Sequence, residues 1–397
     1  MLLDDQSERG WQIQYATEFH MTSDSDLFSP LPKWEDKGYR PDDYGRWVDS
    51  NDNIALPLYE GRMIGPFDPS EKGWVSGKGR GAMWREFPFE NKVFWPQYLM
   101  SIETYMEQGR VLRGNKIGFI DIGSATNTRS MYASLIVDMP CGNVVPVLQP
   151  EIHDVISVLS LAACLNSLTY DYALRCRLGG LHLNYFVVAE TPLIPPSYIR
   201  QSPCAQLAAR LNFIMPRFAT QWLELCDTYP DLIELHWRRL WAITTHERLR
   251  LRCILDAITA EFYKLSYDDF AWILRDVPTN PKGFWRVDKD RPKELRQTTL
   301  ALAAFKRLKE VGLEAFSQED WQFPAEIEAQ LGPRFTAWQE QGTVAESWAE
   351  CEEHVQRMKE IPMPLPKYGT QKNNGKQSIN GSEKATEIEQ ADLWSLG

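Results

Sequence analysis

The stretch KIGFIDIGSATNTRSMYASLIVDMP, residues 116–140, decides the fold class of this chain. It contains two apolar runs rich in β-branched and aromatic residues, separated by a polar segment, which predicts two neighbouring strands. The next stretch, IHDVISVLSLAACLNSLTYDYALRCRL (residues 152–178), has apolar residues at helical spacing and is followed by Gly179 and Gly180 as a stop signal. Short strands followed by helices predict an α+β fold.

The composition changes along the chain and predicts four segments. Residues 1–54 are polar, aromatic and turn-rich, which predicts irregular loops. Residues 55–200 predict a small, mostly β domain with one long helix and a further strand over 182–196. Residues 201–360 carry amphipathic helical patterns and predict a helical domain. Residues 361–397 are poor in apolar residues and rich in Pro, Gly, Asn and Ser, which predicts a disordered tail.

The composition also excludes several function classes. No run of about 18 apolar residues is present, and the chain starts with acidic and polar residues, so we expect a cytoplasmic protein without a membrane span. The seven cysteines are scattered singly, which predicts neither a disulfide framework nor a metal site. The net charge of −11 argues against a uniformly basic nucleic-acid binder. Basic residues nevertheless cluster between residues 62 and 129, so a local positive face is compatible with the sequence.

The glycine-rich basic loop GWVSGKGRGAMW, residues 73–84, is the first candidate site. It is not a Walker loop, because Gly79 follows Lys78 where such a loop has Ser or Thr. One interpretation is a loop that follows a DNA backbone with Lys78 and Arg80. The other is a flexible surface loop.

Two further motifs leave two interpretations each. The first is LYEGRMIGPFD, in which Tyr59, Glu60 and Arg62 combine an aromatic face with groups able to bind a phosphate or a base edge. The other interpretation of this motif is a buried tyrosine and an internal Glu60–Arg62 ion pair. In SATNTRS, residues 124–130, short polar side chains and one arginine suit a base edge or a phosphate, or form a polar turn. The candidate DNA-contacting residues of this second motif are Thr126, Asn127 and Arg129. For Asn166 and Ser167, on an apolar helix, we favour a structural role.

Three segments, in this order, carry a resemblance: LPLYEGRMIGPFD (56–68), GFIDIGSATNTRSMYASLI (118–136) and LAACLNSLTYDYALRCRLGGLHLNYFVVAETPLIPP (161–196). They resemble the target-recognition half of adenine-specific DNA methyltransferases of restriction-modification systems, including type IIG enzymes, and of DISARM-type phage-defence systems. With the flanking sequences, the resemblance covers about residues 11 to 315.

The resemblance implies double-stranded DNA as a partner. It places these residues in matching motifs: Tyr59, Glu60, Arg62, Thr126, Asn127 and Arg129. In that family an S-adenosylmethionine-binding domain carries a glycine-rich donor motif and a catalytic Asn-Pro-Pro-Tyr/Phe motif. Neither motif occurs in the sequence, where Asn280-Pro281 is followed by lysine. We therefore expect no catalytic residue, no metal and no cofactor in this chain, with S-adenosylmethionine bound by a catalytic methyltransferase subunit.

Three functions remain open at this point. The first is a DNA-recognition part that needs a separate catalytic partner. The second is the site-specific adenine methyltransferase itself. The third is an inactive truncated fragment with a structural role.

Overall fold

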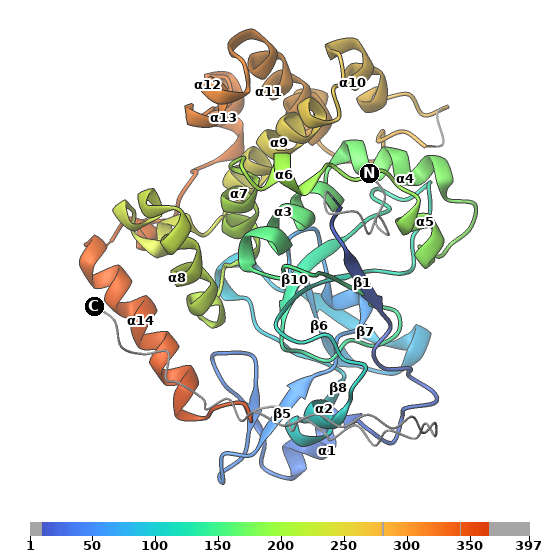
Figure 1. The fold of residues 1–397 in the computed structure, drawn as a ribbon, viewed down its shortest axis with the longest axis vertical. Coiled ribbons are helices and arrows are strands. Elements are labelled where there is room, and N and C mark those ends of the chain that lie inside the picture. The colour runs from blue at the N-terminus through green and yellow to red at the C-terminus, as the bar shows by residue number, and fades with distance from the viewer. Residues whose placement is uncertain (1–9, 280–281, 342, 365–397) are drawn as a thin grey trace, which may run out of the picture. The chain divides into compact units, whose positions relative to one another are not determined.

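The computed structural model describes residues 10–279, 282–341 and 343–364, which belong to one compact unit (Figure 1). The predicted disordered tail lies almost entirely outside the described residues. Strands prevail in the N-terminal part and helices in the C-terminal part, which confirms the predicted α+β class.

The described strands form three antiparallel sheets. Their orders are β1-β11-β9-β10, β2-β8-β5-β4-β3 and β6-β7. In chain order the strands are β1 (Ile13–Ala16), β2 (Ser29–Pro30), β3 (Arg40–Pro41), β4 (Trp47–Val48), β5 (Ile54–Pro57), β6 (Lys72–Ser76), β7 (Met83–Glu86), β8 (Tyr98–Ser101), β9 (Asn115–Phe119), β10 (Ala133–Val137) and β11 (Val147–Pro150).

The two strands predicted from residues 116–140 are confirmed as β9 and β10, which pair with Ile117 opposite Leu135. The N-terminal segment differs from the predicted irregular loops. Its strand β1 pairs with β11, with Ile13 opposite Pro150. Local sequence could not show this, because the partner strand lies more than 130 residues away in the chain.

The described helices are α1 (Leu31–Asp36), α2 (Ile102–Glu107), α3 (Val155–Leu165), α4 (Leu168–Arg177), α5 (Tyr185–Ala189), α6 (Pro196–Ile199), α7 (Cys204–Asn212), α8 (Ala219–Thr228), α9 (Thr245–Phe262), α10 (Tyr267–Leu274), α11 (Gln297–Val311), α12 (Leu313–Gln318), α13 (Ala325–Leu331) and α14 (Val344–Glu360). None of them is long and apolar enough to cross a membrane.

The long helix predicted over residues 152–178 is two helices, α3 and α4. The chain turns at Asn166 and Ser167, and the Ser167 side chain caps α4 by accepting a hydrogen bond from the Tyr170 N–H. The Asn166 side chain bonds both backbone groups of Ala133 in β10. Both residues are buried and hydrogen-bonded, as the structural interpretation predicts.

The prediction of a strand over residues 182–196 was wrong, because this segment contains the short helix α5 instead. The run YFVVA is only five residues long, and so short an apolar run fits one helical turn as well as a strand. The N–H groups of Val187 and Val188 bond the carbonyl of Asn184 and thereby close that turn.

The amphipathic helices predicted within residues 201–360 are confirmed, among others by α7, α9, α10 and α11. Helix α11 ends at Gly312, whose φ of +85° suits glycine. Helix α9 packs on α7 and α11, and α3 packs on β9, β10 and α7 (Figure 1). One continuous hydrophobic core results, which joins Leu135 of β10, Leu159 of α3 and Leu255 of α9.

Candidate nucleic-acid interface

Strands β6 and β7 form a ribbon that pairs with no other strand of the described residues. Trp74 lies opposite Trp84, and the register shifts between Trp74 and Ser76. Val75 and Met83 are 52% and 59% exposed, so the outer part of the ribbon stands in solvent. The outer residues of the ribbon therefore lie at the surface, as does Arg62 of the preceding LYEGR sequence, whereas Leu58 and Tyr59 of that sequence are buried.

The loop at residues 77–82 is fixed at its base. Gly77 has a φ of +80°, and a side chain there would place Cβ 2.5 Å from the Gly81 carbonyl oxygen, so glycine is required. The Gly77 carbonyl accepts hydrogen bonds from Trp74 Nε1 at 3.0 Å and Gln97 Nε2 at 3.2 Å. The base of the loop is thus held while its outer residues project.

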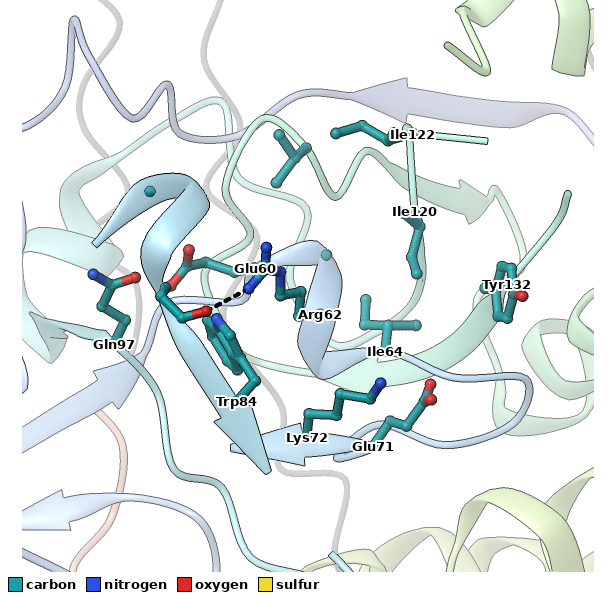
Figure 2. A pocket seen from close by; sticks show the side chains of 14 residues that line it. Glu60, Arg62, Ile64, Glu71, Lys72, Trp84, Gln97, Ile120, Ile122 and Tyr132 are labelled. Carbon is teal, nitrogen blue, oxygen red and sulfur yellow. Dashed lines mark hydrogen bonds between the residues drawn. The ribbon is translucent and has the colours of Figure 1, made fainter. Parts of the chain in front are cut away.

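Lys78 and Arg80 are exposed on this loop. Within the described part of the chain, neither side chain forms a hydrogen bond or an ion pair. Arg62, in the 3-10 turn Gly61–Met63, donates from Nη1 to the Ala82 carbonyl at 2.8 Å and so ties that turn to the end of the loop (Figure 2). The structure therefore brings three predicted cations, at residues 62, 78 and 80, to one region.

A pocket of about 740 Å³ lies beside this loop. Figure 2 shows Ile64, Ile120 and Ile122 on one side of it and Arg62 with Trp84 on the other. Its remaining lining residues are Glu60, Gly61, Glu71, Lys72, Gly79, Ala82, Gln97, Tyr132 and Val144. The pocket thus joins an apolar wall to a wall that carries charged and aromatic groups.

Two carboxyl groups of this pocket have raised pKa values. Burial raises the pKa of Glu60 to about 7, partly opposed by Arg62, and Glu60 Oε1 has no hydrogen-bond partner. Burial and then the nearby Asp68 raise the pKa of Glu71 to about 7. Both groups are therefore partly protonated at neutral pH and can donate as well as accept a hydrogen bond.

These raised pKa values predict a pH-dependent stability. Because the folded pKa exceeds the ordinary value of 4.5, the folded state binds more protons between about pH 4.5 and 7, and stability falls as pH rises through that window. Glu60→Gln is expected to raise the free energy of unfolding by about 1–2 kcal/mol at pH 8, and to change it little at pH 4.5. Urea unfolding at both pH values measures this, with the exposed Glu352→Gln as control. An equal effect at both pH values would contradict the assignment.

Two of the predicted DNA-contacting residues are interior. Tyr59 is 1% exposed, and its hydroxyl donates to the Pro69 carbonyl at 2.8 Å. Arg129 is 7% exposed and donates from Nε to Asp171 at 2.8 Å. Their polar groups already have partners inside the protein, so the prediction that Tyr59 and Arg129 contact DNA does not agree with their buried positions.

Thr126 and Asn127 are exposed on the loop between β9 and β10. The Thr126 N–H donates to Ser124 Oγ at 3.2 Å and the Asn127 N–H to the Ser124 carbonyl at 3.0 Å, which forms a polar turn. Neither side chain lines the pocket, although Ile122 and Tyr132 at the ends of the loop do. Their side chains are accessible, but they are not gathered with the basic residues around the pocket.

The sequence interpretation missed Glu71, Lys72 and Trp84 as lining residues of the pocket. Trp84 ends the quoted glycine-rich stretch and Lys72 directly precedes it, and the hairpin pattern of two short runs around glycines is the signal that could have found them. Within the described residues, no three His, Cys, Asp or Glu side chains come together as a metal ligand set.

A scan against protein-family models and a search of curated proteins both found no match to this chain.

Proposed function

We propose that this chain recognises double-stranded DNA for an adenine-specific methylation system of the restriction-modification or phage-defence kind. The observation that carries the proposal is the exposed β6–β7 ribbon with Lys78 and Arg80 at its tip. The major groove of B-DNA admits a two-stranded β-ribbon. A ribbon that pairs with no other described strand and carries cations at its end has the shape and charge for this role.

The chemistry around the ribbon suits both kinds of DNA contact. Lys78 and Arg80 can neutralise backbone phosphates, which sets affinity and position. Arg62 uses Nη1 for the Ala82 carbonyl, and its other N–H groups remain available for a phosphate or a guanine edge. Glu60, being partly protonated near pH 7, can meet either a donor or an acceptor on a base.

Under this proposal, the methyl transfer takes place on a catalytic domain supplied outside residues 1–397, which binds S-adenosylmethionine. The sequence offers neither the donor motif nor Asn-Pro-Pro, and the described residues provide the recognition surface. Methylation of DNA by this chain alone, measured with labelled S-adenosylmethionine, would refute this division and favour the alternative of a complete methyltransferase.

A second observation favours a partner protein. Ile122 and Leu181 are 55% and 65% exposed. Ile122 forms a bridge with His182, and the Gly123 N–H donates to the Leu181 carbonyl, so Ile122 and Leu181 lie on adjacent segments. Exposed apolar side chains that lie close together are typical of protein interfaces. We assign this face to the catalytic partner, and it would also serve a purely structural role if DNA binding were absent.

The test of the DNA proposal removes the cations of the ribbon tip. Lys78→Ala/Arg80→Ala is expected to weaken binding to a labelled DNA duplex by about tenfold or more at moderate salt, and to reduce the slope of log K against log salt by about 2. Fluorescence anisotropy across a salt series measures both. Lys289→Ala/Lys306→Ala, which removes two other exposed lysines, is the matched control and should bind as the wild type does. Wild-type protein that fails to bind duplex DNA, or a tip variant with unchanged affinity, would overturn the proposal.

A further inference from the structure

A second cleft, of about 310 Å³, gathers cations that the DNA proposal does not use. It lies between the end of β7, the segment from Gly65 to Asp68, and one face of α9. From α9 it receives Arg248 and Arg252, which are four residues apart and therefore share one helical face. Lys92 and Arg291 complete its basic lining.

Arg248 is 4% exposed and is held in place by the interior. Its Nη1 donates to the carbonyls of Leu211 at 2.8 Å and Ala242 at 3.0 Å, and its guanidinium stacks 3.8 Å from the centre of the Phe89 ring. Burial lowers the pKa of Arg248 to about 9, and the positive charge of Arg252 contributes to this lowering. The group is still protonated at pH 7, so the wall of the cleft carries a fixed positive charge.

Arg252 is the unusual member of the cluster. Its Nε is buried and has no hydrogen-bond partner, and no ion pair to its side chain is found within residues 10–279, 282–341 and 343–364. Burial lowers its pKa, opposed in part by Asp288, and Arg129 adds to the lowering. A buried N–H group without a hydrogen-bond partner is costly, so the Arg252 Nε in this cleft points to a partner that comes from outside.

The carboxylates near the cleft do not neutralise this charge. Asp68 forms an ion pair with Lys92 at 2.6 Å. Glu86, whose side chain is 74% exposed, forms an ion pair with Lys72 at 3.2 Å. Burial raises the pKa of Glu71 to about 7, so this group carries only part of a negative charge at neutral pH. Arg291 is half-buried at the cleft, and it forms no ion pair with any described residue. Within the lining of the cleft, three guanidinium groups therefore face carboxyl groups that are paired with lysine or only partly charged, while Asp288 and Asp256, outside the lining, oppose part of the Arg252 charge.

We propose that the cleft lined by Arg248, Arg252 and Arg291 is a binding site for a phosphoryl group, with Arg252 as its central ligand. The planar guanidinium fork matches phosphate oxygens, and a dianionic ligand would satisfy the donors that the protein leaves open. The phosphoryl group can belong to a free phosphate or nucleotide or to a DNA strand, and both sources share this chemistry. This proposal depends on the cleft and not on the ribbon, so it can be tested independently of the DNA proposal.

The test uses sodium phosphate, pyrophosphate and adenosine monophosphate against the full chain, with sodium chloride at matched ionic strength as reference. Calorimetric titration and thermal unfolding are the measurements. We expect phosphate compounds to bind and to raise the Tm of the wild type beyond the chloride reference. Arg252→Gln should weaken this binding at least tenfold, while its ligand-free Tm equals or exceeds that of the wild type, because a buried N–H group without a partner is removed.

Arg291→Gln, at a less buried position, is the second variant and should also weaken binding. Arg307→Gln, which alters an exposed ion pair with Glu319, is the control and should keep wild-type affinity. No phosphate-specific stabilisation of the wild type, or unchanged affinity in both cleft variants, would overturn the proposal. If duplex DNA displaces phosphate and Arg252→Gln weakens DNA binding, the group is a DNA phosphate. If nucleotide binding is lost in Arg252→Gln while DNA binding is unchanged, it belongs to a small ligand.

Discussion

Asp171→Asn is expected to lower the free energy of unfolding by about 3–5 kcal/mol. The Asp171 carboxylate is fully buried and accepts from Arg129 Nε and Arg175 Nε, both at 2.8 Å, and from the Ser130 N–H at 3.1 Å. Without its charge, two buried guanidinium groups would lose their counter-ion. Desolvated charges that lose their partner are far more costly than a broken surface pair.

The same network fixes the loop between β9 and β10, because Arg175 also donates to the carbonyls of Asn127 at 3.0 Å and Thr128 at 2.8 Å. Urea unfolding measures the stability change, and the rate of limited proteolysis within residues 124–130 should rise in parallel. Glu353→Gln breaks an exposed ion pair with Arg357 and should change stability by less than about 1 kcal/mol. If the two variants unfold alike, the buried network does not stabilise the fold as we infer.

The second large effect is expected for Glu247→Gln, again a loss of about 3–5 kcal/mol. Glu247 is buried on α9 and receives Arg210 at 2.6 Å, Arg250 at 2.8 Å and Arg334 at 2.6 Å. The interaction joins α7, α9 and the segment before the 3-10 turn Ala337–Glu340, so its loss would loosen the packing of three distant parts of the chain.

Acid should reduce the difference between wild type and Glu247→Gln. Burial by itself would raise the pKa of Glu247, but the Arg250 hydrogen bonds and the charges of Arg210 and Arg250 hold this pKa well below its ordinary value. A carboxyl with a lowered folded pKa contributes its stability above about pH 4.5 and loses it as pH falls below. The measured difference should therefore be full at pH 6 and should shrink towards pH 3.

Asp320→Asn provides the matched control for Glu247→Gln. Asp320 contacts two of the same arginines, Arg250 at 3.0 Å and Arg334 at 2.7 Å, but its side chain is 64% exposed. Water screens such a group, so we expect a loss of less than about 1 kcal/mol. A loss as large as that of Glu247→Gln would show that burial is not what makes the Glu247 interaction strong.

Sequence periodicity was sufficient where an element is long and regular. Helices α9 and α11 were predicted because their apolar positions repeat over four or more turns, and β9 and β10 because two β-rich runs flank a polar segment. Helix α5 was missed because five residues do not distinguish a helical turn from a strand. Strand β1 was missed because its pairing partner is distant in the chain.

For the candidate site, the sequence identified residue types but not their burial. Lys78 and Arg80 are exposed, as a glycine-rich loop suggests, whereas Arg129 is enclosed by Asp171 from a helix forty residues away. Arg80 and Arg129 are both arginines, and only the tertiary contacts of each residue show that one is a surface cation and the other an interior counter-ion. Arg248 and Arg252 carried a usable signal, since two arginines four apart in a core helix lie on one face.

The ribbon of β6 and β7 has an implication for how this molecule can change over evolution. It is a separate two-stranded sheet, joined to its surroundings by a few bonds such as that between the Trp74 N–H and the Trp95 carbonyl at 2.8 Å. Substitutions at the exposed positions between Gly77 and Gly81 leave the hydrophobic core untouched. New preferences for a ligand can therefore arise at the tip by few mutations, each nearly neutral for folding, while Gly77, where a side chain would meet the Gly81 carbonyl, stays in place.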